Sequence, residues 1–354
     1  MLIDRTTGQR IKIGGIIPSE NKPSNSKKYT ASRFENDALP SKVDLRQYMT
    51  KVENQASVNS CVANALVGAY EYLAKRHLGD SEDVSRLFVY YNARAKDGIE
   101  NKDVGSRVSS SIEVLSELGA CSEETWSYDP QLVNQKPSEE AYEEAKNFLI
   151  EEADDIDVDL YSMKHCLAEG YPFVFCLKLF KSFDYAKQKG IVPLPDLSTE
   201  SGRKSHGNHA MLCVGYLDNH QVFIVRNSWG ENWGDGGYCY IPYSYLTNPD
   251  LCWDCWAIRN VTDLDFSSDV WDDDDDDQWD YDYSEDDDYG YDYEDEDEDE
   301  DDEDYEDDDE DEDDEDYEDE DEDDEDYEDE DYEDEDDEDD EDEDEDDEDD
   351  EDEE

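Results

Sequence analysis

The stretch that decides the fold is residues 227–238, which read NSWGENWGDGGY. The apolar run at residues 222–226 comes directly before it and predicts a β-strand that ends at Asn227. A side-chain amide at that point can orient an imidazole through a hydrogen bond, and Trp229 can shield that bond from water. The aromatic residues of the stretch are also expected to pack. We therefore expect this stretch to serve both structure and function.

A histidine and a cysteine earlier in the chain could form a catalytic pair with this orienting amide. Among the five histidines, His209 opens the strand-like run at residues 210–216, where a base can be held rigidly. Cys61 follows an Asn-Ser helix-capping signal and so lies in the first turn of a predicted helix. The positive helix end would stabilise its thiolate, and a nearby imidazolium would lower the thiol pKa further. Gln55 and the Cys61 backbone N–H can both donate to a developing oxyanion.

Together these segments resemble the three signature blocks of papain-family cysteine proteases. The blocks are QASVNSC at residues 55–61, NHA at residues 208–210 and the stretch at 227–238. Cys61 precedes His209 by 148 residues and Asn227 by 166, which is near the expected separation. Residues 39–46, LPSKVDLR, look like the start of the mature domain. The resemblance covers about residues 39–262, which we take as the protease domain, after an extension at 1–38 and before a linker and tail at 263–354.

The resemblance implies a role for each candidate residue. Cys61 would be the nucleophile, His209 the general base and acid, Asn227 the orienting residue and Gln55 the oxyanion donor, with Trp229 covering the Asn227–His209 contact. Gly105 and Ser106 would correspond to the backbone strip that pairs with substrate. The implied fold is α+β with two lobes: a helical lobe whose central helix starts at the nucleophile, and a β-barrel-like lobe. The implied activity is hydrolysis of peptide bonds through an acyl-enzyme.

Some positions depart from the pattern of secreted papain-like enzymes. Val58 stands where those enzymes carry a disulfide cysteine, and Val62 stands where they carry Trp. Asn59 replaces the usual Gly, and we expect it to survive there because Asn tolerates left-handed backbone. Residues 85–94 and 192–195 resemble a disulfide-poor subgroup known from bacteria and large DNA viruses. The extension at 1–38 is too short and polar to resemble the long helical inhibitory propeptide of the family.

Periodicity alone predicts a helical half followed by a strand-rich half. Apolar residues at helical spacing predict a buried helix of about 15–18 residues from Cys61 onward. Further helices are expected at residues 85–95, 109–118 and 138–150, and strands at 171–180, 210–216, 222–227, 237–241 and 253–259. In the extension, residues 11–17 could form one strand, and the remainder reads as a linker. This order favours an α+β protein with a cleft between two lobes.

The C-terminal tail has a different composition from the body. Residues 269–354 hold 71 of the 110 Asp and Glu residues and no Lys or Arg. The remaining 39 acidic residues face 28 basic ones, so the body carries only −11 of the net charge of −82. The ten residues at 311–320 are repeated identically at 321–330. Such density of like charge with so little apolar area predicts disorder.

Composition also excludes several classes of function. Nothing is basic enough for a nucleic-acid-binding face, and no apolar run is long enough to cross a membrane. The first residues, MLIDRT, do not form a signal-peptide pattern, so we expect a cytoplasmic protein, located in the host cytoplasm or virion if the source is viral. Eight cysteines in such a chain are expected to be reduced. Cys252 and Cys255 make one C-x-x-C pair, too few for a four-ligand zinc site, so we expect no metal and no cofactor.

Three functions remain open from the sequence. The first is a cysteine peptidase, endo- or exo-acting, that is a monomer and acts on peptide or protein substrates. The second is a catalytically silent papain-like scaffold whose polyanionic tail binds basic partners. The third is an acyl transferase or deamidase that uses the same thiol chemistry.

Overall fold

The structure is a computed structural model that describes residues 2–3, 10–31, 39–79, 83–200 and 207–259. All of these belong to the first of two compact units into which the chain divides, residues 1–280. The acidic tail expected from residue 269, and the linker expected from 263, lie outside the described residues. Within the described part of the chain, no helix is long and apolar enough to cross a membrane.

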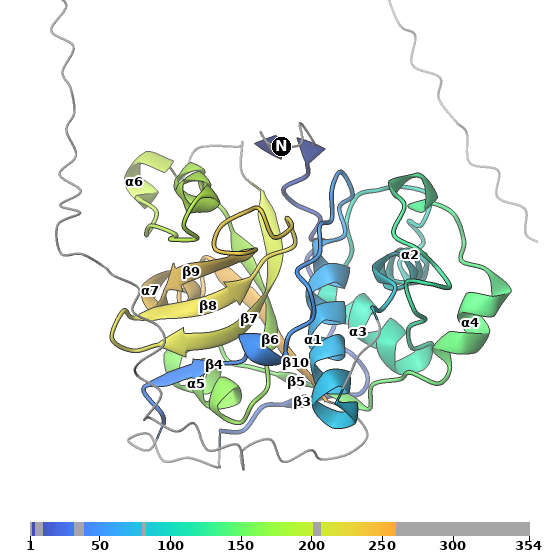
Figure 1. The fold of residues 1–354 in the computed structure, drawn as a ribbon, viewed down its shortest axis with the longest axis horizontal. Helices are drawn as coiled ribbons and strands as arrows, with labels where there is room; N and C mark the ends of the chain where they lie inside the picture. The colour runs from blue at the N-terminus through green and yellow to red at the C-terminus, as the bar shows by residue number, and fades with distance from the viewer. Residues whose placement is uncertain (1, 4–9, 32–38, 80–82, 201–206, 260–354) are drawn as a thin grey trace, which may run out of the picture. The chain divides into compact units, whose positions relative to one another are not determined.

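The helical lobe is built around α1 (Cys61–Leu78), which begins at the candidate nucleophile. Its residues 61–73 are buried on every side, because α2 and α3 lie against one face and the sheet against another (Figure 1). The neighbouring helices are α2 (Arg86–Lys96), α3 (Val108–Glu117) and α4 (Glu139–Ala145). Ser85 caps α2 by accepting the Phe88 N–H at 3.2 Å. At the other end of α1, the chain leaves through Gly79 in the left-handed conformation, with φ of 82°.

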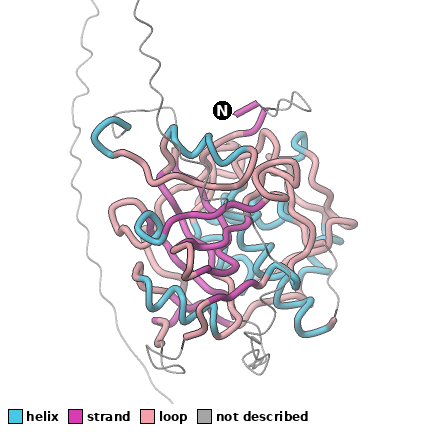
Figure 2. The backbone as a smooth tube through the Cα atoms, turned by 60° about the vertical axis from the view of Figure 1, so that its left-hand side comes forward, coloured by secondary structure: helices cyan, strands magenta, loops and turns pink. Residues whose placement is uncertain are grey.

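The second lobe holds one eight-stranded sheet. Its strand order is β3-β5-β10-β6-β7-β8-β9, and β4 pairs with β7 beside this path. The strands are β3 (Ser26–Lys28), β4 (Lys42–Asp44), β5 (Glu152–Asp155), β6 (Phe173–Lys178), β7 (Asn208–Leu217), β8 (Val222–Arg226), β9 (Tyr238–Pro242) and β10 (Cys252–Arg259). A small ribbon of β1 (Leu2–Ile3) and β2 (Arg10–Ile11) lies apart from this sheet, as Figure 2 shows. Because β7 pairs with β8, the two strands that carry His209 and lead into Asn227 are neighbours.

Short helices complete this lobe. They are α5 (Leu160–Ala168), α6 (Leu197–Glu200) and α7 (Tyr243–Leu246), with 3-10 turns at Arg46–Tyr48 and Lys181–Lys187. A further 3-10 turn, Pro130–Leu132, lies on the helical lobe, where Arg94 of α2 donates to the carbonyl of Val133. The sequence pattern had not predicted α5. It begins after Asp159, whose carboxylate accepts the Ser162 N–H at 2.9 Å. Residues 154–159 therefore combine the end of β5 with this helix cap.

The expected helix at residues 138–150 ends early, at Ala145. The last turn tightens, because the Phe148 N–H donates to the Ala145 carbonyl at 3.0 Å. Gly119 packs against that same carbonyl so closely that a Cβ on it would lie 2.0 Å from the oxygen. The Ile150 N–H then donates to Leu115 at 3.1 Å and draws the chain onto the end of α3. Tertiary contacts therefore overrode the local helical pattern.

The N-terminal extension is attached to the body over most of its described length. Residues 12–31, called the strap from here on, contact the cleft first and then the sheet. The strand expected at 11–17 is reduced to β2 and one isolated bridge, Ile16 to Ser106. The expected linker beyond it contains β3, which adds a parallel edge strand to β5. Tyr29 is buried, and its hydroxyl lies 2.5 Å from Nδ1 of His165.

Candidate active site

The thiol of Cys61 lies at the start of α1, under the strap. Its sulfur accepts hydrogen bonds from the backbone N–H groups of Val62 and Ala210, so it lies beside the residue that follows His209. The same sulfur lies 3.7 Å from the carbonyl oxygen of Gly14, a strap residue. Cys61 is fully buried. The structure thus brings together the predicted helix start and the predicted strand of His209.

His209 and Asn227 are joined by a direct hydrogen bond. His209 Nε2 lies 2.9 Å from Asn227 Oδ1, and both side chains are buried. Because the amide oxygen accepts, Nε2 carries the hydrogen in this contact. The other ring nitrogen, Nδ1, has no partner among the described residues and is left available as a base. Trp229 stacks on the imidazole with ring centroids 4.8 Å apart, which limits the access of water to the bond.

Gln55 is buried and held from both ends of its amide. The Ser228 hydroxyl donates to Oε1 at 2.6 Å, and Nε2 donates to the Val58 carbonyl at 2.9 Å. The bond to Val58 settles which end of the amide is the NH₂ group, because a carbonyl oxygen can only accept. An amide NH₂ has two hydrogens, so one remains after the bond to Val58. The backbone of Gln55 also donates to the Ser228 carbonyl at 2.8 Å, which ties this segment to the residue after Asn227.

Burial changes the acid–base state of Cys61 and His209. It raises the pKa of the Cys61 thiol to about 11, even though three backbone N–H groups partly offset it. It also lowers the pKa of His209 to about 4, against the smaller opposing effect of Asn227. The expectation of a thiol with a low pKa is therefore wrong for the covered site. Desolvation under the strap outweighs the helix end, and both groups are neutral there.

Comparison with known proteins places this geometry in a family. The model of the papain family cysteine protease, Peptidase_C1, matches residues 39–250. The chain belongs to the papain family. An uncharacterized peptidase C1-like protein of Acanthamoeba polyphaga mimivirus is 37% identical over 233 residues, which cover 62% of this chain and 73% of that protein. Rat cathepsin Q is 27% identical over 215 residues, covering 58% and 59% of the two chains.

Solved structures agree with this assignment. Xylellain, a cysteine protease from Xylella fastidiosa, matches with a TM-score of 0.62 and 35% identity, over 74% of this chain and all of that one. Digestive procathepsin L 3 of Tenebrio molitor matches with a TM-score of 0.54 at 20% identity, over 67% and 75%, and supports the fold alone. The resemblance to a family with bacterial and viral members is confirmed, and so are the papain-like α+β fold and the cysteine peptidase activity.

In this papain-family chain the strap fills the cleft. Ser106 donates to the Gly15 carbonyl at 3.0 Å, and Ile17 donates to the Ser106 carbonyl at 3.1 Å. On the other side of Cys61, Lys12 donates its backbone N–H to Ala56 at 3.1 Å. The fit leaves no room for a side chain at Gly15, where a Cβ would lie 2.4 Å from the Asn59 carbonyl oxygen. The strip expected to pair with substrate therefore pairs with the chain's own strap.

Asp103, which was not among the residues predicted from the sequence, holds this corner of the site. Its carboxylate accepts the Asn59 N–H at 2.9 Å and the Tyr90 hydroxyl at 2.7 Å, and it pairs with Lys12 at 2.6 Å. Asn59 itself does not adopt the left-handed backbone that its place in the motif suggested. Hydrogen bonds to Asp103 hold it instead, including one from its amide to the Asp103 carbonyl at 2.6 Å. No local signal marked Asp103, because its partners are distant in sequence.

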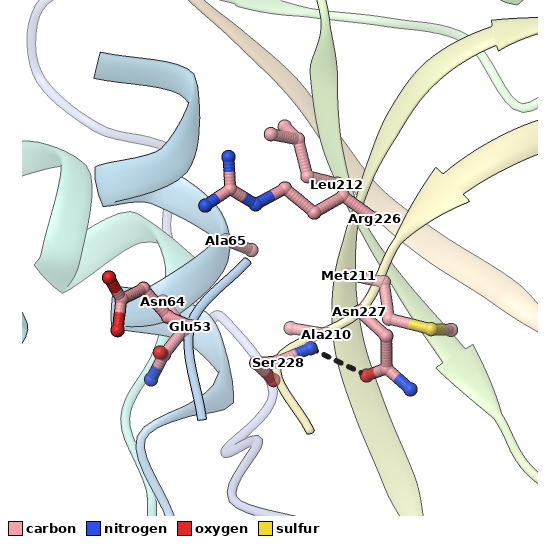
Figure 3. Close-up of a pocket in the computed structure, with 9 residues that line it drawn as sticks. All are labelled: Glu53, Asn64, Ala65, Ala210, Met211, Leu212, Arg226, Asn227 and Ser228. Atoms are coloured by element: carbon pink, nitrogen blue, oxygen red, sulfur yellow. Dashed lines mark hydrogen bonds between the residues drawn. The ribbon is translucent and has the colours of Figure 1, made fainter. Parts of the chain in front are cut away.

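A second group of missed residues joins the two lobes behind Asn227. Arg226, the preceding residue, extends its guanidinium from β8 toward α1 (Figure 3) and donates to Thr50 at 3.2 Å. Thr50 in turn donates to Glu71 of α1 at 2.5 Å. Burial raises the pKa of Glu71 to about 7. The small cavity between these elements offers about 10 Å³, which is about one water molecule and too small for a substrate.

The cysteines other than Cys61 lie outside this constellation. These seven are free and buried, as Cys61 is, and Sγ of Cys252 lies 3.7 Å from Sγ of Cys255. Among the described residues, no group of three or more His, Cys, Asp or Glu side chains is placed to hold a metal ion.

Proposed function

We propose that this cysteine peptidase uses Cys61 as nucleophile, His209 as general base and acid, Asn227 to orient His209, and Gln55 as oxyanion donor. The observation that carries the proposal is the His209–Asn227 hydrogen bond at 2.9 Å. That bond occupies Nε2 of His209 and leaves Nδ1 free to take the thiol proton. The residue after His209, Ala210, donates its backbone N–H to the Cys61 sulfur, so the base lies beside the nucleophile. A nucleophile, a base and an orienting group within reach of one another are what acyl transfer requires.

The reaction would proceed in two halves. Nδ1 of His209 takes the Cys61 proton, and the sulfur attacks the carbonyl carbon of the scissile peptide bond. The negative charge that forms on the carbonyl oxygen is stabilised by the Gln55 side-chain N–H and the Cys61 backbone N–H. His209 then gives its proton to the leaving amine, which breaks the C–N bond and leaves a thioester. Water, deprotonated by His209, hydrolyses the thioester and restores the thiol.

We infer that the chain with its strap seated is latent. The strap presents the oxygen of the Gly14 carbonyl to the sulfur, whereas attack needs the carbon. Burial also keeps the thiol protonated and the imidazole neutral. The strap therefore blocks substrate and suppresses the thiolate at once. Turnover would require residues 12–19 to leave the cleft.

The main rival is a catalytically silent scaffold, and labelling with a thiol-reactive inhibitor discriminates it from an active peptidase. The four intact residues argue against it, since a decayed site would be expected to lose at least one of them. The third possibility, acyl transfer or deamidation, uses the same thiol but another acceptor or amide. A thiol-reactive epoxide inhibitor that labels Cys61 and abolishes peptide cleavage would support the peptidase mechanism. Labelling without any peptide cleavage would favour the third.

For the acidic tail we propose capture of Lys- and Arg-rich protein substrates. A tail with 71 acidic residues among its 86 positions attracts basic proteins over about 8–10 Å at physiological ionic strength, and more salt weakens the attraction. Deleting residues 269–354 should leave turnover of a small neutral peptide nearly unchanged and weaken cleavage of a basic protein at low salt. If neither substrate responds, the tail serves solubility alone. We also propose that the protein works as a monomer in the cytoplasm.

The roles of Asn227 and Gln55 are tested by comparing the hydrolysis rates of their alanine variants with that of the natural chain. The natural chain and its Asn227→Ala and Gln55→Ala variants would each be given a chromogenic ester and a peptide under reducing conditions. Loss of Gln55 should slow acylation by about 10²–10³-fold, as expected for one oxyanion donor. Wild-type rates in both variants would sink the assignment of these two residues, while the papain-family membership would stand.

A further inference from the structure

A tyrosine from the helical lobe contacts both segments that carry the candidate oxyanion donors. Tyr128 lies in the loop between α3 and the 3-10 turn at Pro130–Leu132, 73 residues from Gln55 in sequence. Its hydroxyl donates to the backbone carbonyl of Gln55 at 2.9 Å. The same hydroxyl lies 2.6 Å from that of Ser60, the residue before Cys61. One side chain therefore links the segment of the Gln55 amide to the segment of the Cys61 backbone N–H.

The hydrogen bonds around Tyr128 have a fixed direction. A tyrosine hydroxyl has one hydrogen, and the bond to Gln55 uses it, because a carbonyl oxygen can only accept. Ser60 must then donate to the Tyr128 oxygen, and the Ser60 oxygen in turn accepts the Asn64 side-chain N–H at 3.0 Å. Burial raises the pKa of the Tyr128 hydroxyl, against smaller opposing effects of Ser60 and Arg86, so it keeps its proton near neutral pH. The donors therefore run in one direction, from Asn64 to Gln55.

The ring of Tyr128 is held independently of its hydroxyl. The Arg86 guanidinium lies over the ring face, 4.0 Å from the ring centroid. Arg86 is itself held by the carboxylates of Glu53 at 2.9 Å and Glu123 at 3.0 Å. Glu123 also accepts the backbone N–H of Tyr128 at 2.7 Å. The ring should therefore keep its place in Tyr128→Phe, so that this variant removes the hydroxyl alone.

The Gln55 carbonyl that Tyr128 binds belongs to the turn that shapes the oxyanion site. The same carbonyl accepts the Val58 N–H at 3.1 Å, and the Val58 carbonyl accepts the Gln55 side chain at 2.9 Å. A shift of the Gln55 backbone would therefore move its side-chain N–H relative to the developing oxyanion. Because a donor stabilises that charge best at about 2.7–3.1 Å, even a small shift weakens the interaction.

We propose that Tyr128 is a positioning residue that holds the two oxyanion donors at a fixed separation. Its hydroxyl ties the Gln55 backbone to Ser60, and Ser60 directly precedes the Cys61 N–H. The hydroxyl is occupied by these two protein partners, so it acts through them rather than on the substrate. This inference rests on the proposed peptidase mechanism and adds to it a residue of the helical lobe.

The test compares an ester with the matching thionoester, in which sulfur replaces the carbonyl oxygen. Sulfur is a weak hydrogen-bond acceptor, so the thionoester gains little from the oxyanion donors while it uses the same nucleophile. The full-length chain and its Tyr128→Phe, Ser60→Ala and Tyr142→Phe variants are assayed for kcat/KM on both substrates. Tyr142 is the matched control, because its hydroxyl donates at 2.7 Å to Asn92 of α2 and to neither donor segment. Withdrawal of the strap affects both substrates equally and cancels from their ratio.

In Tyr128→Phe, kcat/KM for the ester should fall about tenfold, while that for the thionoester stays within about twofold. A selective loss of this kind separates positioning from a general loss of stability, which would lower both values together. Ser60→Ala breaks the chain of donors one step earlier and should lower the ester-to-thionoester ratio about two- to fivefold. Tyr142→Phe should match the natural chain on both substrates.

An unchanged ester-to-thionoester ratio in Tyr128→Phe overturns the positioning role and leaves the peptidase mechanism intact. If Tyr128→Phe does not fold, Ser60→Ala decides the question, and an unchanged ratio there overturns the role in the same way. Absence of hydrolysis of both substrates by all four chains overturns the proposed mechanism and this inference together.

Discussion

Residues 227–238 and the strap both border the candidate active site, yet they are held in place by different forces. The first stretch is packed: Trp229 and Trp233 are buried, and their rings meet edge to face at 5.0 Å. At Gly237, a Cβ would lie within 2.9 Å of the Val52 side chain, so the backbone is fitted to its neighbour. The strap is held mainly by backbone pairing and by ion pairs of Lys12, Lys22 and Lys28 with Asp103 and Asp155, and only its far end is anchored by a buried side chain, Tyr29.

This difference separates the chemistry from access to it. Buried aromatic packing is lost only when the lobe unfolds, because it is continuous with the core. Exposed ion pairs contribute about 0–1 kcal/mol each and weaken with salt. We therefore expect the site to persist when the part of the strap that covers Cys61 leaves, without unfolding of the protease.

The largest effect is expected from a substitution in the site itself, at Cys61. Cys61→Ser should lower peptide turnover by about 10⁴-fold or more, because a hydroxyl is a far weaker nucleophile here. Displacing the strap should not restore it. The measurement is kcat/KM on a neutral peptide, with circular dichroism to compare folds. Wild-type turnover in the variant would remove Cys61 from the mechanism.

A smaller loss is expected from the orienting amide. Asn227→Ala should lower kcat by about 10²-fold, because His209 keeps its base but loses the bond that fixes Nε2. Asn232→Ala is the matched control, an exposed amide in the same loop, and should stay near wild type. Equal effects of the two substitutions would mean that the loop, rather than the bond, is what matters.

The strap is tested by steric exclusion. Gly15→Val should raise turnover of a small peptide by about tenfold, because its Cβ would lie 2.4 Å from the Asn59 carbonyl oxygen. Gly98→Val is the control: Gly98 also has positive φ, at 69°, but no atom lies within 4 Å of its Cβ position. Both glycines have positive φ, 124° at Gly15 and 69° at Gly98, so a valine is strained at each, but only Gly15 also meets a neighbouring backbone atom. A rise in both, or in neither, would contradict the strap as the cover.

The smallest effect concerns the ion pairs of the strap. Lys28 pairs with Asp157 at 2.6 Å and with Asp155 at 3.4 Å, and its side chain is half exposed. Lys28→Gln should raise turnover only about two- to fivefold and speed hydrogen exchange in β3. Lys146→Gln removes an exposed pair on α4 and should change neither measurement. Slower exchange in the Lys28 variant would contradict an electrostatic clamp.

The parts of the site that sequence could predict are those with strong local signals. Cys61 followed a capping signal, His209 opened an apolar run, and Asn227 ended another. The structure places these on α1 and on the paired strands β7 and β8. The central helix and the five main strands were predictable for the same reason, because their apolar periodicity is local.

The rest depends on contacts between distant segments. Asp103 holds Asn59 from 44 residues away, and Ser106 holds the strap from about 90. Beyond residue 17 the strap looked like a linker, because polar residues that pair backbone to backbone leave no hydrophobic pattern. Likewise, a thiol at a helix end predicts a low pKa only if water reaches it, and Gly14 covers it.

The central claim is that a removable strap covers a competent cysteine, and alkylation of Cys61 tests it most directly. Its rate with iodoacetamide would be followed from pH 5 to 10 by peptide mass spectrometry, which separates Cys61 from the seven other cysteines. In the natural chain the rate should stay low and rise only toward high pH, because burial raises the thiol pKa to about 11 and only the thiolate reacts. In Gly15→Val the rise should come at lower pH and reach a higher rate near neutrality. Identical pH profiles for the two chains would contradict the account.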